Sequence, residues 1–192
     1  MRKQVRETVE CVHNEVWECE ILEIKKKSIV LRTVRLVVAK NIPQSFQLAF
    51  GNLKPSRLEM LLEKCTEIGV TDFYPLITSR TQYNHISHDR SIKIIKSAAS
   101  QSLKTYLPNL NPIQLLHKLK LDDTWAMASL NTEQSERSSG FTRLLVGPEG
   151  GWSQAEEDYC KECGVSLVSL GSCVLRAETA CIIGSWKLLS AQ

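Results

Sequence analysis

The chain has 192 residues, 43% hydrophobic and 23% charged, which suffices for one domain with a small appendage and excludes a disordered chain. The formal net charge of +3 permits an anionic partner without requiring one. No apolar run approaches the roughly 20 residues of a membrane-spanning helix, and the first residues lack the apolar core of a signal peptide, so we expect a cytoplasmic protein with no membrane partner.

The cysteines point to a reducing environment. The chain has seven, an odd number, and they are scattered, which favours free thiols over a disulfide framework. Cys160 and Cys163 have CxxC spacing, but they lie at the predicted end of a helix, whereas redox motifs lie at a helix start. A zinc site would need Cys173 and Cys181 as further ligands, so we interpret the pair as ordinary helix thiols and expect no metal.

The first part of the chain alternates apolar and polar residues in the manner of strands. Residues 16–24 and 28–36 predict a β-hairpin whose turn carries Lys25, Lys26 and Lys27. These lysines either lie in a solvated turn or contact a phosphate backbone. A lone hairpin is marginal in water, so it must join a larger sheet or pack on the rest of the chain. The pattern changes near Ser45, and we place a domain boundary between residues 1–45 and 46–192.

From Phe46 onward, predicted strands and helices alternate. The strands are expected at 46–50, 71–77, 125–130, 142–146 and 165–170. Helices are expected over 55–69, over 91–106, from Pro112, over 153–164 and over 178–189, with a polar loop at 131–140. The first helix should begin with a capping box from Ser56 to Glu59, and the fourth with one from Ser153 to Glu156. The helix from Pro112 would place Leu115, Leu116 and Leu119 on one side. This alternation predicts an α/β fold with a mostly parallel sheet covered on both faces, and ligands bind such sheets beyond the carboxyl ends of the strands.

Two connections at such strand ends carry the functional signal. Residues 144–153 read LLVGPEGGWS, which is neither GxGxxG nor a loop followed by GK[ST], and Glu149 would repel a phosphate. This loop is either a tight turn before a capped helix or a backbone surface for a flat or cationic ligand. Residues 170–180 read LGSCVLRAETA; Arg176 and Glu178 either cap the last helix or, in the case of Arg176, face an anionic substrate.

Together these stretches resemble the SPOUT methyltransferases, and more narrowly the RsmE-type uridine-N3 methyltransferases of ribosomal RNA. That family carries a GPEGG loop followed about twenty residues later by LG…LRxETA, as at Gly147–Gly151, Leu170–Gly171 and Leu175–Ala180 here. Its KATELGV segment is similar to residues 64–70. The resemblance covers roughly residues 46–192.

The resemblance implies an α/β fold with a deep C-terminal trefoil knot, a homodimer, S-adenosyl-L-methionine as cofactor, and a uridine of small-subunit ribosomal RNA, or of its precursor particle, as substrate. It implies catalytic roles for Arg176, Glu149 and Thr179, and we favour for Glu149 a structural role in holding the loops. The residues expected around the cofactor are Ser129, Leu130, Gly147, Glu149, Gly150, Leu170, Gly171, Val174, Leu175, Arg176 and Ala180. The residues expected to contact RNA are Lys54, Arg80, Gln101 and Lys104.

The chain also departs from the family pattern. The family opens with a fuller PUA-like β-barrel, so residues 1–45 are expected to form a truncated PUA-like β subdomain. Lys104 stands where the family tends to have arginine, which would replace a bidentate phosphate contact by a point charge. Two alternatives therefore stay open: a SPOUT methyltransferase that acts on another RNA site, and a non-catalytic RNA-binding or ribosome-assembly protein that retains the knot.

Overall fold

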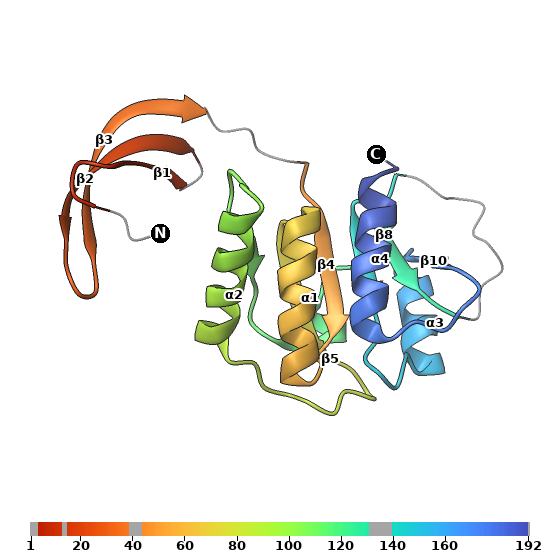
Figure 1. The fold of residues 1–192 in the computed structure, drawn as a ribbon. Helices are drawn as coiled ribbons and strands as arrows, with labels where there is room; N and C mark the ends of the chain where they lie inside the picture. Colours follow the sequence, from red (N-terminus) through yellow and green to blue (C-terminus); the bar gives the residue numbers. More distant parts are fainter. Residues whose placement is uncertain (1–3, 13–14, 39–43, 131–139, 192) are drawn as a thin grey trace.

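The computed structural model describes residues 4–12, 15–38, 44–130 and 140–191, and these form two sheets. One sheet has three strands near the N-terminus, and the other has seven strands and carries the helices (Figure 1). Within the described ranges, no helix is both long enough and apolar enough to cross a bilayer. Most of the polar loop predicted at 131–140 lies outside the described residues.

The three-stranded sheet contains β1 (Thr8–Val12), β2 (Val16–Ile24) and β3 (Ile29–Val38), in that order. Both pairings are antiparallel, so the hairpin predicted from the alternating pattern is confirmed. The strand β1 was not predicted, because five residues provide too little alternation to distinguish a strand from a loop. The predicted boundary at Ser45 falls between β3 and the second sheet, while the PUA-like character of residues 1–45 stays a prediction.

The seven-stranded sheet is entirely parallel, which confirms the predicted fold class. Its order is β10-β8-β9-β4-β5-β6, with β7 also paired to β5. The strands are β4 (Gln47–Gly51), β5 (Asp72–Ile77), β6 (Asn109–Leu110), β7 (Gln114–Leu115), β8 (Trp125–Ala128), β9 (Arg143–Val146) and β10 (Ser166–Val168). The trefoil knot implied by the resemblance stays a prediction.

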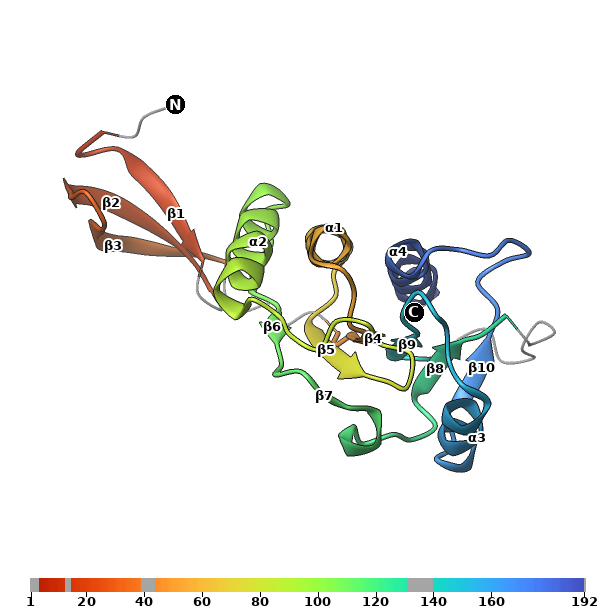
Figure 2. The ribbon, with the colours of Figure 1, turned by 90° about the horizontal axis from the view of Figure 1, so that it is seen from below.

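Helices cover the two faces of this sheet unequally. Figure 2 shows α1 (Pro55–Ile68), α2 (His88–Gln101) and α4 (Ala177–Leu189) side by side on one face. Among the described residues, the other face carries α3 (Gln154–Glu162) and a 3-10 turn, η1 (Leu116–Lys118). Because each parallel strand is followed by a return segment, the carboxyl ends of the strands and the N-termini of α1, α3 and α4 meet at one edge.

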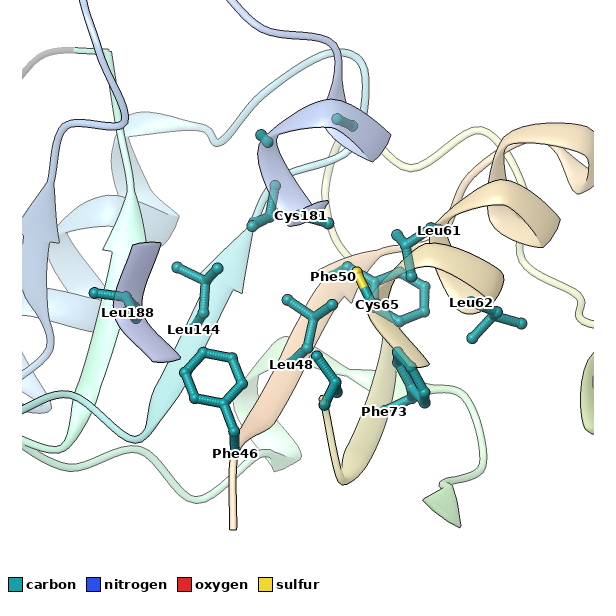
Figure 3. Close-up of a cluster of buried hydrophobic side chains, with 14 of the residues drawn as sticks. Phe46, Leu48, Phe50, Leu61, Leu62, Cys65, Phe73, Leu144, Cys181 and Leu188 are labelled. Carbon is teal, nitrogen blue, oxygen red and sulfur yellow. The ribbon is translucent and has the colours of Figure 1, made fainter. Parts of the chain in front are cut away.

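The larger core lies between the sheet and the three-helix face (Figure 3). Alternation along β4 directs Leu48 and Phe50 into this core and Ala49 into the smaller core on the opposite face. On α1 the predicted apolar stripe is buried as expected, and Gly69 ends the helix at φ 123°. The side chains of this stripe are Leu58, Leu61, Leu62 and Cys65.

Three helix predictions were wrong in detail. The N-cap of α1 is Lys54, with Pro55 in the first turn, so Ser56 lies inside the helix and forms no capping box. Helix α2 ends at Gln101 rather than at residue 106, because Leu103 turns the backbone to φ 53°. The helix predicted from Pro112 is absent, since residues 114–115 pair in parallel with β5 instead. The Ser153–Glu156 capping box is confirmed.

Replacing Leu61 by Ala tests the larger core. Leu61 is fully buried between α1 and the sheet, so Leu61→Ala is expected to lower the free energy of unfolding by about 2–5 kcal/mol. Met60, the preceding residue, is 51% exposed, and Met60→Ala is expected to change it by no more than about 0.5 kcal/mol. Urea denaturation measures both, and equal effects would contradict the packing described.

Candidate active site

A cavity of about 510 Å³ opens at the carboxyl ends of β8, β9 and β10, against the N-terminus of α4. The two sequence stretches singled out above, which α3 and β10 separate in the chain, both line it. Every residue predicted around the cofactor lines this cavity, namely Ser129, Leu130, Gly147, Glu149, Gly150, Leu170, Gly171, Val174, Leu175, Arg176 and Ala180.

Glycine is required where the loop after β9 crosses the end of β4. A Cβ at Gly51 would lie 2.4 Å from Cδ of Pro148, so no larger residue fits there without moving the loop. On the other side of the cavity, Gly171 has φ 147°, and a Cβ at this position would meet no atom within 4 Å. The backbone at Gly171 is therefore exposed at the cavity, while the loop that contains Pro148 is held closely against the end of β4.

An arginine that the sequence analysis did not single out connects the cavity walls. Arg57 Nη1 on α1 donates a hydrogen bond to Oε1 of Glu149 at 3.1 Å, and Arg57 Nε lies 3.9 Å from Oε1 of Glu178. Glu178 is buried, and its Oε2 has no hydrogen-bond partner among the described residues. Arg57 thus compensates the charge of a buried carboxylate and ties α1 to both the glycine loop and α4.

A second set of polar contacts holds the loop after β5 against the glycine loop. Arg80 Nη1 donates to the carbonyl oxygen of Gly150 at 2.8 Å. Glu156 accepts hydrogen bonds from the backbone N–H of Ser79 at 2.7 Å and from that of Ser153 at 2.9 Å. Burial opposes ionisation of Glu156, but the hydrogen bonds from Ser153 and Ser79 outweigh it and lower the pKa of this carboxyl below its ordinary value.

Other residues of the cavity wall were also missed by the sequence analysis. Glu157 on α3 is buried and accepts a hydrogen bond from Oγ of Ser129 at 3.0 Å. Trp152 and Glu157 line the cavity beside the glycine loop. A signal for Arg57 did exist: its position in the first turn of a helix after β4 places it at the carboxyl edge of the sheet. Nothing in the sequence indicates that Glu157 faces inward.

Of the three predicted catalytic residues, two line the cavity. Arg176 is the N-cap of α4; its side chain is exposed and makes no hydrogen bond or ion pair with another described residue. Glu149 is held by Arg57 as described. Thr179 lies in the first turn of α4, half-buried, outside the residues that line the cavity.

The predicted RNA contacts fall at two different ends of the sheet. Lys54 and Arg80 lie at the carboxyl edge, and Arg80 lines the cavity. Gln101 ends α2, and Lys104 follows it, so both lie toward the amino edge of the sheet (Figure 1). A single RNA-binding surface around the cavity would therefore include Lys54 and Arg80 but not Gln101 and Lys104.

Comparisons with known proteins agree with this geometry. A ribosomal RNA small subunit methyltransferase E from Neisseria gonorrhoeae, solved with bound S-adenosylmethionine, superimposes with a TM-score of 0.84 at 25% identity, over 95% of this chain and 82% of that one. A Legionella pneumophila protein, solved with the same cofactor, superimposes with a TM-score of 0.84 at 26% identity, over 98% of this chain and 85% of that one. The Synechocystis ribosomal RNA small subunit methyltransferase E is 30% identical over 86% of this chain, which spans only 59% of that relative.

The fold and the position of the cavity thus define an α/β protein of the SPOUT methyltransferase class. Residues 40–185 match the RNA methyltransferase domain model, and the chain belongs to this family. The resemblance to RsmE-type enzymes drawn from the two motifs is confirmed by these relatives.

Replacing Arg57 by Met tests the buried charge pair. The change leaves Glu178, whose side chain is 7% exposed, without its compensating cation, so we expect the free energy of unfolding to fall by about 1–3 kcal/mol. Adding Glu178→Gln should recover part of the loss, because it removes the uncompensated charge. As a control, Arg90→Met breaks an exposed pair with Glu59 and should lower the free energy of unfolding less than Arg57→Met does in the same urea denaturation. Equal losses in Arg57→Met and Arg90→Met would contradict the assignment.

Proposed function

We propose that this chain is an S-adenosyl-L-methionine-dependent enzyme that methylates N3 of a uridine in small-subunit ribosomal RNA, free or in its precursor particle. The observation that carries the proposal is the convergence of the Gly147–Gly151 loop and the Leu170–Ala180 segment on one cavity. The names of the relatives and the cofactor bound in two solved structures support it. Such a substrate would be met in the cytoplasm.

The cavity residues fit the proposed cofactor. A volume of about 510 Å³ lies within the range of sites for ligands of this size. Leu130, Val174 and Leu175 provide apolar surface for a flat base, and the loop backbone provides hydrogen-bonding groups next to it. The carboxylates of Glu149 and Glu157 suit a ligand that carries positive charge. When bound, S-adenosylmethionine would supply a methyl group on a positively charged sulfur.

Arg176 would act on the RNA base. As N3 of uracil loses its proton, negative charge spreads onto the neighbouring carbonyl oxygens. The Arg176 guanidinium lines the cavity, is exposed, and has no partner among the described residues, so it is available to stabilise that charge. Fixing the base beside the cavity would contribute further, because positioning alone supplies up to about 7–11 kcal/mol in favourable reactions.

Glu149 would have a structural role. Its carboxylate accepts the hydrogen bond of Arg57, which supports a function in holding the loop rather than in moving a proton. Thr179 would act through the first turn of α4, since it does not line the cavity. Lys54 and Arg80 would guide the RNA toward the cavity, while Gln101 and Lys104 would contact RNA at the other edge of the sheet.

Replacing Arg176 by Ala tests the proposed reaction. With ribosomal RNA from cells that lack the endogenous activity, the unsubstituted chain should transfer a labelled methyl group to N3 of one uridine, identified by mapping the modified base. Arg176→Ala should lower turnover about 100-fold or more, because a fixed charge at the reacting group is lost. Its urea denaturation curve should be unchanged, since the side chain is exposed and makes no hydrogen bond or ion pair with a described residue.

One control variant and three outcomes decide how this experiment is interpreted. Arg90→Ala removes an exposed arginine from α2 and should leave turnover unchanged. A label on a base other than uracil would favour another RNA target. An absence of transfer, together with no S-adenosylmethionine binding in calorimetry, would favour the non-catalytic alternative. Unchanged turnover in Arg176→Ala would reject the role given to Arg176.

The homodimer implied by the resemblance is also proposed here. Large apolar side chains stay exposed on α4 and beside the cavity, among them Trp186 at 62% and Val174 at 78%. An exposed apolar surface of this kind next to a binding site is typical of a protein interface. A second copy seated on α4 would cover Trp186 and bring its surface close to the cavity.

Replacing Trp186 by Glu tests the dimer. A charge in the interface should convert a dimer into a monomer, which sedimentation velocity or light scattering measures directly. Val34 is 58% exposed on β3, far from α4, so Val34→Glu should leave the mass unchanged. A monomeric unsubstituted chain, or a dimer that withstands Trp186→Glu, would overturn this assignment.

A further inference from the structure

A second cavity, of about 460 Å³, lies on the α3 face of the sheet, at the amino ends of the strands, whereas the first lies at their carboxyl ends. It is lined by one side chain from each of four neighbouring strands and by the segment that follows β6. The lining residues are Gln47, Tyr74, Asn111, Pro112, Gln114, Lys118, Leu119, Lys120, Trp125 and Arg143.

The strand register explains why these side chains meet. Gln47 of β4 and Trp125 of β8 both pair with Arg143, the first residue of β9, and parallel partners project to the same face. Tyr74 lies two residues into β5 and shares this face with Ala49, its partner in β4. The face is open here because residues 112–120 form β7 and a 3-10 turn in place of the expected helix.

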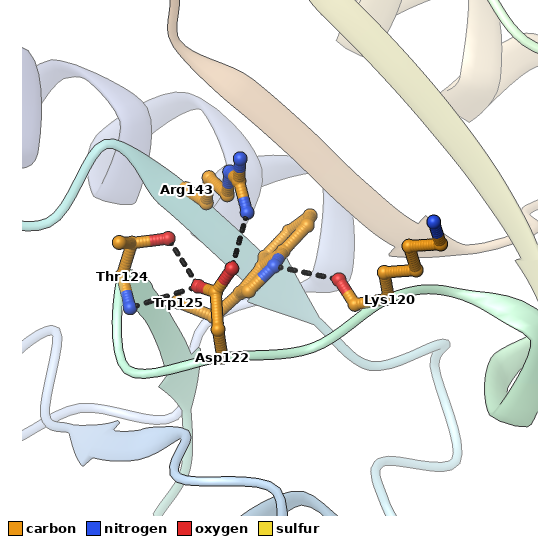
Figure 4. A network of polar contacts seen from close by, with 5 residues as sticks. All are labelled: Lys120, Asp122, Thr124, Trp125 and Arg143. Carbon is orange, nitrogen blue, oxygen red and sulfur yellow. Dashed lines mark hydrogen bonds and ion pairs between the residues drawn. The ribbon is translucent and has the colours of Figure 1, made fainter.

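One wall of the second cavity is held in place by polar contacts (Figure 4). The indole Nε1 of Trp125 donates to the carbonyl oxygen of Lys120 at 3.1 Å, and Arg143 Nη1 donates to Oδ2 of Asp122 at 2.8 Å. The Arg143 guanidinium lies 5.7 Å from the centre of the Trp125 ring, and this ring forms a T-shaped pair with Tyr74. These contacts fix a cation and two aromatic rings before any ligand arrives.

The described lining combines cations, amides and two aromatic side chains, and it contains no carboxylate. Lys118 and Lys120 are exposed, and neither ammonium group forms an ion pair or hydrogen bond with a described residue. The amides of Gln47, Asn111 and Gln114 offer both donors and acceptors. Cations suit a phosphate, whereas amides beside an aromatic ring suit the edge and face of a nucleobase.

We infer that this second cavity binds one nucleotide, with its phosphate on Lys118 and Lys120 and its base against Tyr74 and the amides. The nucleotide is either a free nucleoside monophosphate or an unpaired residue of RNA. The RNA source rests on the proposed function, and it agrees with the position of Gln101 and Lys104 toward the same edge of the sheet. RNA bound there and at the first cavity would span both ends of β9.

The test compares three ligands on matched variants. Fluorescence anisotropy with a labelled single-stranded oligouridylate measures RNA binding, and calorimetry with uridine monophosphate and with inorganic phosphate measures the free ligands. The double variant Lys118→Gln/Lys120→Gln should weaken RNA binding about tenfold and reduce the slope of log affinity against log salt by about 1–2. Tyr74→Leu should weaken binding of the oligouridylate and of uridine monophosphate, but not of phosphate.

The control Lys93→Gln/Lys96→Gln removes the same charge from exposed positions on α2, on the other face of the sheet, and should have little effect. A loss confined to uridine monophosphate assigns the site to free nucleotides, and a loss that includes the oligouridylate assigns it to RNA. Unchanged binding of both ligands in the cavity variants, or an equal loss in the control, overturns the inference. S-adenosylmethionine titration of each variant reports separately on the first cavity, so failure of one proposal does not conceal the state of the other.

Discussion

The parallel pairing of β4 with both β5 and β9 is the constraint on which the rest of this structure depends. It makes β4 a central strand, whose two faces are buried by the two cores, and it brings the end of β4 against the loop that follows β9. A Cβ at Gly51 would overlap Pro148 at 2.4 Å, so this approach needs glycine as well as the pairing. With the loop held there, the segment after β10 closes the other side of the first cavity.

Ion pairs of Arg57 then stabilise the contacts between the segments that the sheet brings together. Arg57 reaches Glu149 on the glycine loop and the buried Glu178 on α4, so one guanidinium links three segments distant in sequence. A buried carboxylate without a cation is costly, which makes the position of Arg57 a condition for the packing of α4. Arg176, in contrast, has no such partner among the described residues, which is consistent with the substrate role proposed for it.

Strand β9 connects the two cavities, because Arg143 at its first residue lines one and Val146 at its last lines the other. The two sites differ in chemistry. Glycine backbone, apolar side chains, two carboxylates and three arginines surround the first, while cations, amides and two aromatic side chains surround the second. The first cavity therefore presents groups of both charges to a ligand, and the described lining of the second presents only cations and neutral groups.

The sequence by itself determined the alternation of strands and helices and the Ser153 cap, because local periodicity and capping depend on neighbours in the chain. The residues expected around the first cavity came from the resemblance of two of its motifs to a known family. Only the tertiary structure decided the conformation of residues 112–120, where the pairing of residues 114–115 with β5 replaces the helix that the local pattern predicts. It alone placed Arg57 between two carboxylates and aligned Gln47, Tyr74 and Arg143 on one face. These outcomes depend on strand order and register, which pair residues too distant in sequence for any local pattern to record.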